Sequence, residues 1–137
     1  MSNPLEFFCG LVLEAQGGPM RFCFDIDGVL MTGPTMTDHD YTQSTPIWPM
    51  IHIVNWLHKH GHYIILHTAR GGVSGKNWEE QTKKQLCEYG IPCHELIFGK
   101  PAADVYIDDR GMAPETLKSF MKLVWETSKP GEPASPR

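Results

Sequence analysis

The stretch RFCFDIDGV, residues 21–29, decides the fold, because an apolar run ends there in two aspartates, Asp25 and Asp27, followed by Gly28. Side chains of a strand alternate between its two faces, so residues two apart point the same way. We therefore expect both carboxylates on one side of a strand end, with a turn at Gly28. This placement suits a small anion and a metal ion. An ordinary strand end before an Asp-Gly turn has the same local pattern, so the choice between a site and a plain turn depends on the other motifs of the chain.

Size and charge limit the class of protein. The 137 residues suit one domain with a core of its own, and the net charge of −4 gives no general attraction to nucleic acid or anionic membranes. The four cysteines form no CxxC pair, which is typical of reduced thiols. No apolar run approaches the ~20 residues that span a bilayer, and no basic segment precedes residues 7–13 as in a secretory signal. We expect a cytoplasmic protein with no membrane partner.

Strand and helix patterns alternate along residues 20–128, which we expect to form the domain. Residues 1–19 read as an N-terminal extension, and residues 129–137, rich in proline, read as a disordered tail. The predicted strands are residues 21–26, 62–67, 95–98 and 103–107, and the predicted helices are residues 46–60, 78–89 and 113–126. This order predicts an α/β fold, a three-layer Rossmann-like parallel sheet with helices on both faces. Ligands of such sheets bind at the carboxyl ends of the strands.

Besides the first predicted strand, polar residues follow two more of the predicted strands. Thr68, Ala69 and Arg70 come directly after residues 62–67, and a hydroxyl, an arginine and freed backbone amides suit a phosphate oxygen. Asp108 and Asp109 follow residues 103–107, where two adjacent carboxylates repel each other unless a cation lies between them. Taken singly, each motif is more often an ordinary strand end, a helix cap or a solvated side chain. Together they lie at the same predicted edge of the sheet.

The chain carries its motifs in the order DIDGV, a strand ending in Thr68, then Lys100, and then the Asp108-Asp109 pair. In this order of its motifs, the chain resembles the haloacid dehalogenase superfamily of aspartate-nucleophile phosphotransferases. The resemblance covers residues 20–126. It implies that Asp25 is the nucleophile, that Asp27 is the general acid and base, and that Thr68, Ala69, Arg70 and Lys100 surround the phosphoryl group. It also implies a Mg²⁺ ion held by Asp25, Asp27, Asp108 and Asp109.

The implied chemistry suits these residue types. Mg²⁺ takes oxygen ligands from carboxylates, waters and a substrate phosphate. An aspartyl phosphate forms on Asp25, and Asp27 protonates the leaving alcohol and later activates water. Dehalogenases of the superfamily lack the second aspartate, so Asp27 favours a phosphatase.

The spacing adds that no cap domain fits. Fewer than twenty residues separate Asp27 from Pro46, and residues 69–99 have room for one helix and one strand. Capless relatives act on large substrates or take a lid from a neighbouring subunit, so we expect a homo-oligomer. The segment 31–44, with His39, Asp40 and Tyr41, is a candidate for substrate selection.

The stretches GHYIILHTARG, residues 61–71, and FGKPAADVYIDDRG, residues 98–111, resemble short bacterial proteins of the superfamily associated with capsule and lipooligosaccharide synthesis. This resemblance implies a small phosphorylated sugar or a related metabolite as substrate. Two alternatives remain. A polynucleotide 3′-phosphatase would use a basic patch made of Arg70, Lys76, Lys83 and Lys84, although Glu79 and Glu80 dilute its charge. A catalytically inactive binding protein of the same fold is the other.

One departure from the family pattern concerns Lys100. Parallel neighbours need a connection of about a dozen residues, yet only residues 99–102 separate the last two predicted strands. Either residues 95–98 are not a regular parallel strand, or this edge of the fold is trimmed. Lys83, Lys84 and Arg70 are the alternatives to Lys100 as the cation at the phosphate.

Overall fold

The computed structural model describes residues 19–33, 40–72 and 75–126. The predicted tail, almost all of the predicted N-terminal extension, and His39 lie outside these residues.

Three parallel strands form the sheet, in the order β1-β2-β3. They are β1 (Arg21–Asp25), β2 (Tyr63–Thr68) and β3 (Glu95–Phe98). Asp25 lies opposite His67 in the register, and Thr68 lies opposite Phe98, so all three strands end at the same edge. The described residues thus contain the α/β, Rossmann-like arrangement that the alternating pattern predicts.

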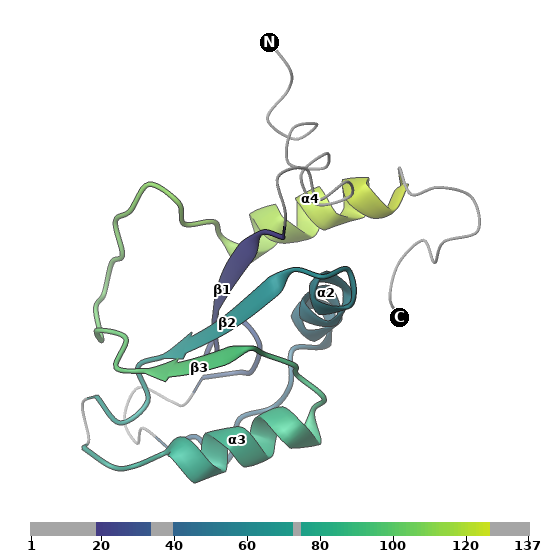
Figure 1. Cartoon of the computed structure of the whole chain (residues 1–137). Coiled ribbons are helices and arrows are strands. Elements are labelled where there is room, and N and C mark those ends of the chain that lie inside the picture. The colour runs from purple at the N-terminus through teal and green to yellow at the C-terminus, as the bar shows by residue number, and fades with distance from the viewer. Residues whose placement is uncertain (1–18, 34–39, 73–74, 127–137) are drawn as a thin grey trace.

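Three helices accompany the sheet: α2 (Trp48–Lys59), α3 (Glu79–Glu88) and α4 (Pro114–Glu126). Figure 1 shows α3 and α4 at opposite ends of the molecule, with α2 between them. Apolar residues recur at helical spacing in α2, where Met50, Ile51, Val54 and Leu57 are buried. Pro49 lies in the first turn of this helix, where its missing N–H leaves no hydrogen bond unmade.

The helices pack on one face of the sheet, which corrects the predicted three layers. Phe24, Leu66 and Thr68 point to this face and are buried, whereas Cys23 is exposed on the other face and Ile97 is 41% exposed there. Right-handed crossovers between strands in the order β1-β2-β3 place both connecting helices on the same side. α4 joins them by packing against α2, where the Trp56 and Trp125 rings meet. The described residues therefore form two layers.

The predicted strand at residues 103–107 is also wrong. These residues belong to an extended arm, residues 99–113, which leaves the sheet after β3 and arches back to α4 (Figure 1). β3 ends at the carboxyl edge, so a parallel neighbour must start about 17 Å away, at the opposite edge. The five Cα steps from Phe98 to Ala103 span at most about 18 Å, whereas a start on the side of β1 away from β2 also lies about 14 Å across the sheet and hence about 22 Å away in all. On its side away from β2, β1 pairs with no other named strand in the described residues.

No helix among the described residues is long and apolar enough to cross a membrane.

Candidate active site

Asp25 and Lys100 meet at the carboxyl edge of the sheet. Lys100 Nζ lies 3.2 Å from Asp25 Oδ2, and the backbone N–H of Lys100 donates to the carbonyl of Thr68. This backbone bond extends the β2-β3 pairing by one step, which turns the lysine side chain towards the end of β1. The other carboxylate oxygen of Asp25, Oδ1, accepts the N–H of Ile26 at 2.9 Å. The Asp25 side chain is 34% exposed, so a ligand from solvent can reach it.

Asp27 pairs with Arg70. The Nε and Nη2 groups of Arg70 donate to Oδ2 and Oδ1 of Asp27 at 2.9 and 2.8 Å, a two-pronged contact in one plane. Arg70 lies two residues after the end of β2, and its side chain is fully buried. Its guanidinium therefore faces Asp27 and the interior, and it is closed to a phosphate group from solvent, contrary to the sequence-based expectation.

Thr68 and Ala69 form the passage from β2 to this arginine. Thr68 is completely buried, and its hydroxyl oxygen accepts the backbone N–H of Arg70 at 3.1 Å. The carbonyl of Ala69 accepts the N–H of Gly72, which closes a tight turn. Gly71 has a positive φ of 84°, and a Cβ there would strike the carbonyl oxygen of Lys76. A glycine is therefore required where the loop folds back on itself.

Asp108 and Asp109 lie on the arm. Oδ1 of Asp108 accepts the backbone N–H groups of Arg110 and Gly111, as a carboxylate does in a turn, and both aspartates are exposed. Asp108 lines the same cleft as Asp25, but no three acidic, histidine or cysteine side chains in the described residues could hold a metal ion together. The carboxylates as they lie do not fit the predicted Mg²⁺ ion.

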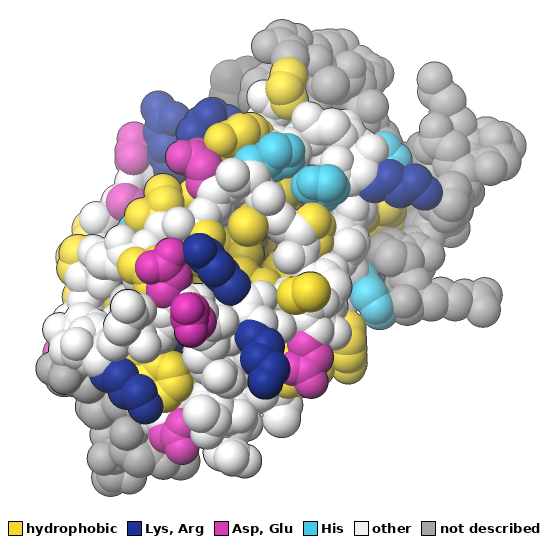
Figure 2. Space-filling view, turned by 60° about the horizontal axis from the view of Figure 1, so that its bottom comes forward, with side chains coloured by type: hydrophobic (Ala, Val, Ile, Leu, Met, Phe, Trp, Pro, Cys, Tyr) yellow, Lys and Arg dark blue, Asp and Glu magenta, His cyan; other side chains and the backbone are white. Residues whose placement is uncertain are grey.

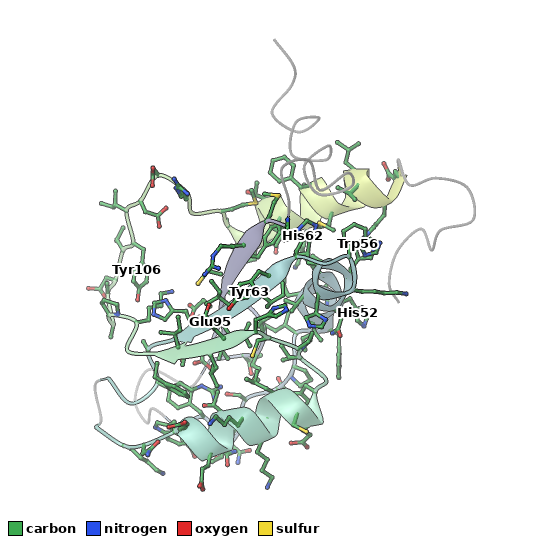
Figure 3. The ribbon with its side chains drawn as sticks, viewed as in Figure 1. His52, Trp56, His62, Tyr63, Glu95 and Tyr106 are labelled. Carbon is green, nitrogen blue, oxygen red and sulfur yellow. The ribbon has the colours of Figure 1, made fainter. Side chains whose placement is uncertain are left out.

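A cleft of about 800 Å³ separates β1 from the arm. Besides Asp25, Lys100 and Asp108, its lining includes His67, Tyr106 and Arg110. Figure 3 shows Tyr106 on the arm, well apart from Trp56 and His52 on α2. The ring of Tyr106 lies 4.2 Å from Lys100 Nζ, a cation–π contact that holds the lysine at the base of the arm.

His67 is a cleft residue that the sequence did not single out as functional. Its position opposite Asp25 in the parallel register follows only once the pairing of β1 and β2 is known. Tyr41, a sequence-based candidate for substrate selection, lies outside this lining, and its ring is 4.6 Å from the Arg70 guanidinium. Burial raises the pKa of Tyr41, and the negative charge of Asp27 adds to this effect.

Cys23 lies on β1 in the same cleft. Partial burial raises the pKa of its thiol, the positive charge of Lys100 opposes this shift, and Asp25 and Glu95 add to it. The pKa of the Cys23 thiol therefore depends on the charges of the site.

The basic patch proposed for a nucleic acid does not form as a unit. Arg70 is buried, and Lys83 pairs with Glu79 at 2.9 Å. On the face of the molecule in Figure 2, lysine and arginine side chains are interspersed with acidic ones.

Comparisons with known proteins support the fold alone. No protein-family profile matches the chain, and no curated protein matches it. A solved structure from Vibrio cholerae, a structural genomics target, is similar with a TM-score of 0.57 and 24% sequence identity. The match covers 80% of this chain and 99% of that one. This likeness agrees with a Rossmann-like α/β fold.

Proposed function

We propose that this protein is a phosphomonoester hydrolase of the capless haloacid dehalogenase type, with Asp25 as its nucleophile. The observation that carries the proposal is the contact between Asp25 and Lys100 at the carboxyl ends of parallel strands. A carboxylate and a dianionic phosphate repel each other, and an ammonium group beside both lowers that repulsion. The open cleft next to Asp25 supplies room for the substrate.

The reaction has two displacements. An Asp25 oxygen attacks phosphorus, the bond from phosphorus to the substrate oxygen breaks, and the leaving alcohol takes a proton from Asp27, which enters this step protonated. Water then attacks phosphorus, the bond to Asp25 breaks, and Asp27 takes the proton back. The products are an alcohol and inorganic phosphate, and both aspartates return to their first state.

The Mg²⁺ requirement stays a prediction. The steps above are written for the side chains alone, because the carboxylates as they lie form no metal site. A small phosphorylated sugar or related metabolite stays the proposed substrate class. The nucleic-acid alternative loses support, since Arg70, one of the four residues of its basic patch, is buried.

An assay with an aryl phosphate, sugar phosphates and 3′-phosphorylated oligonucleotides, each with and without Mg²⁺, tests the proposal. We expect the wild-type protein to release phosphate and Asp25→Asn to lose at least about 10³-fold in kcat. Asp104→Asn, an exposed residue of the arm, is the matched control and should keep full activity. Full activity of Asp25→Asn would overturn the proposal.

A further inference from the structure

Every N–H group of the Arg70 guanidinium has a partner inside the protein. Nε and Nη2 donate to the two oxygens of Asp27, Nη1 donates to Thr82 Oγ1 at 3.0 Å and to Gln85 Oε1 at 2.6 Å, and Nη2 also faces Met31 Sδ at 3.7 Å. A guanidinium has five N–H donors, so none remains for a ligand. Arg70 therefore acts on the site only through Asp27.

The partners of Arg70 come from separate parts of the fold. Thr82 and Gln85 lie on one face of α3, three residues apart, and both are buried. The Tyr41 ring covers the guanidinium, and Gln85 Nε2 donates to the Tyr41 carbonyl at 2.7 Å. Tyr41 also meets the Trp78 ring edge-on. These contacts hold the guanidinium in place from several directions. Because Nε and Nη2 of Arg70 bind both oxygens of Asp27, the guanidinium in turn orients the Asp27 carboxylate.

Asp27 itself is not closed off. Its side chain is 18% exposed, in contrast to the buried side chain of Arg70. A carboxylate has about four lone-pair sites on its two oxygens, and the fork occupies one on each oxygen. Each oxygen can therefore still accept a proton from the solvent side.

We propose that Arg70 is a positioning residue that aims the Asp27 carboxylate at the water which hydrolyses the aspartyl phosphate. This inference rests on the proposed function, and it goes beyond it by assigning Arg70 to the second displacement. A base must be held within hydrogen-bond reach of its water, and a misplacement of about 1 Å can cost about 100-fold in rate. A lysine in place of Arg70 keeps the charge but loses the two-pronged contact.

The test uses an aryl phosphate, because its phenolate leaves without a proton and the first displacement then needs no help from Asp27. In Arg70→Lys we expect the second displacement to become rate-limiting and to slow about 10- to 100-fold. kcat and KM should then fall together while kcat/KM stays unchanged, and phosphate should accumulate on Asp25 in acid-quenched samples trapped with hydroxylamine. A merely structural role would lower kcat/KM and leave the phosphorylated fraction unchanged.

Lys118→Arg is the matched control, because it also exchanges one cation for another and Lys118 pairs with a carboxylate, Glu115, on α4 outside the cleft. It should leave kcat, KM and the phosphorylated fraction unchanged. Thr82→Val is a second variant, which removes one acceptor of Nη1 with little change in volume. It should raise the phosphorylated fraction less than Arg70→Lys does. If circular dichroism shows that Arg70→Lys fails to fold, the phosphorylated fraction of Thr82→Val tests the role of Arg70 in its place.

Failure of the inference and failure of the proposed function look different. A wild-type protein that neither releases phosphate nor becomes labelled on Asp25 overturns both. An active wild-type protein whose Arg70→Lys variant folds but accumulates no phosphate on Asp25 overturns the role of Arg70 alone. If the folded variant, or Thr82→Val in its place, accumulates phosphate on Asp25, the assignment stands.

Discussion

Lys100 Nζ lies 3.2 Å from Asp25 Oδ2, although α2, β2, α3 and β3 separate the two residues in the chain. The contact depends on the chain between Phe98 and Lys100, which lies beside the end of β2. The backbone N–H of Lys100 donates to the Thr68 carbonyl and holds this segment there. The site thus takes its cation from the strand farthest from its nucleophile. Of the alternatives to Lys100 considered from the sequence, Arg70 is buried against Asp27 and Lys83 pairs with Glu79.

The first prediction concerns this lysine. Replacing Lys100 by methionine removes the charge that offsets repulsion between Asp25 and a phosphate, so we expect kcat/KM for an aryl phosphate to fall about 10²- to 10³-fold. Lys122→Met, on the exposed side of α4, is the matched control and should leave kcat/KM unchanged. Wild-type kcat/KM in Lys100→Met would remove Lys100 from the site.

The second prediction uses Cys23 as a reporter of charge and needs no substrate. Thiolate is the reactive form, and burial raises the pKa of Cys23, so its alkylation rate should keep rising as the pH passes 9.0, the ordinary pKa of a thiol. Lys100 lowers this pKa, so Lys100→Met should raise it further and slow the alkylation of Cys23 at any pH below it. Rates for each cysteine follow from mass spectrometry of peptides.

Cys87, which is exposed on α3, serves as the internal control and should react at the same rate in both proteins. An unchanged or faster reaction of Cys23 in Lys100→Met would contradict the placement of the Lys100 charge near Cys23 in the cleft.

Local patterns predict most of the elements, because the apolar spacing that defines a strand or a helix lies within a few residues. β3 occupies residues 95–98 as expected, and the ends of α2, α3 and α4 fall within two residues of their predicted positions. The strand at residues 103–107 fails because Val105 and Ile107 have the spacing of a strand, yet the chain before them is too short to bring them back to the sheet. Whether the connecting chain is long enough depends on the strand order, and the strand order cannot be deduced from the spacing of apolar residues.

The candidate site divides in the same way. Asp25 and Thr68 end their strands and Lys100 lies two residues after β3, so their common edge can be predicted from the sequence. The contact of Arg70 with Asp27 cannot be predicted in this way. It depends on the position of α3, which places Thr82 and Gln85 within hydrogen-bond distance of the guanidinium. A basic residue beside a strand end reads as a phosphate ligand until the position of that helix is known.

The third prediction concerns the loop after Arg70. Gly71 and Gly61 have nearly the same φ, 84° and 87°, so an alanine at either position costs about 1 to 2 kcal/mol through the backbone alone. At Gly71 the new Cβ also strikes the Lys76 carbonyl, whereas at Gly61 it meets nothing within 4 Å. Gly71→Ala should therefore lower the free energy of unfolding in urea by about 1 to 3 kcal/mol more than Gly61→Ala does. Equal losses would show that the loop does not approach itself as described.

The fourth prediction tests the arm against the strand expected from the sequence. Ile107 is 92% exposed and Ile64, on β2, is fully buried, so the same substitution has different consequences at the two positions. Ile64→Ala removes buried methyl groups and leaves a cavity, which should cost about 2 to 5 kcal/mol in the free energy of unfolding.

Ile107→Ala should change that free energy by less than about 0.5 kcal/mol, as is usual for a surface substitution. Urea unfolding curves of the two variants and the wild-type protein, measured at the same pH and temperature, give both values. A strand at residues 103–107 packed on the core would instead bury Ile107, and its truncation would then cost as much as that of Ile64. A loss above about 2 kcal/mol at Ile107 would therefore contradict the exposed arm and favour pairing of this segment with the free edge of β1.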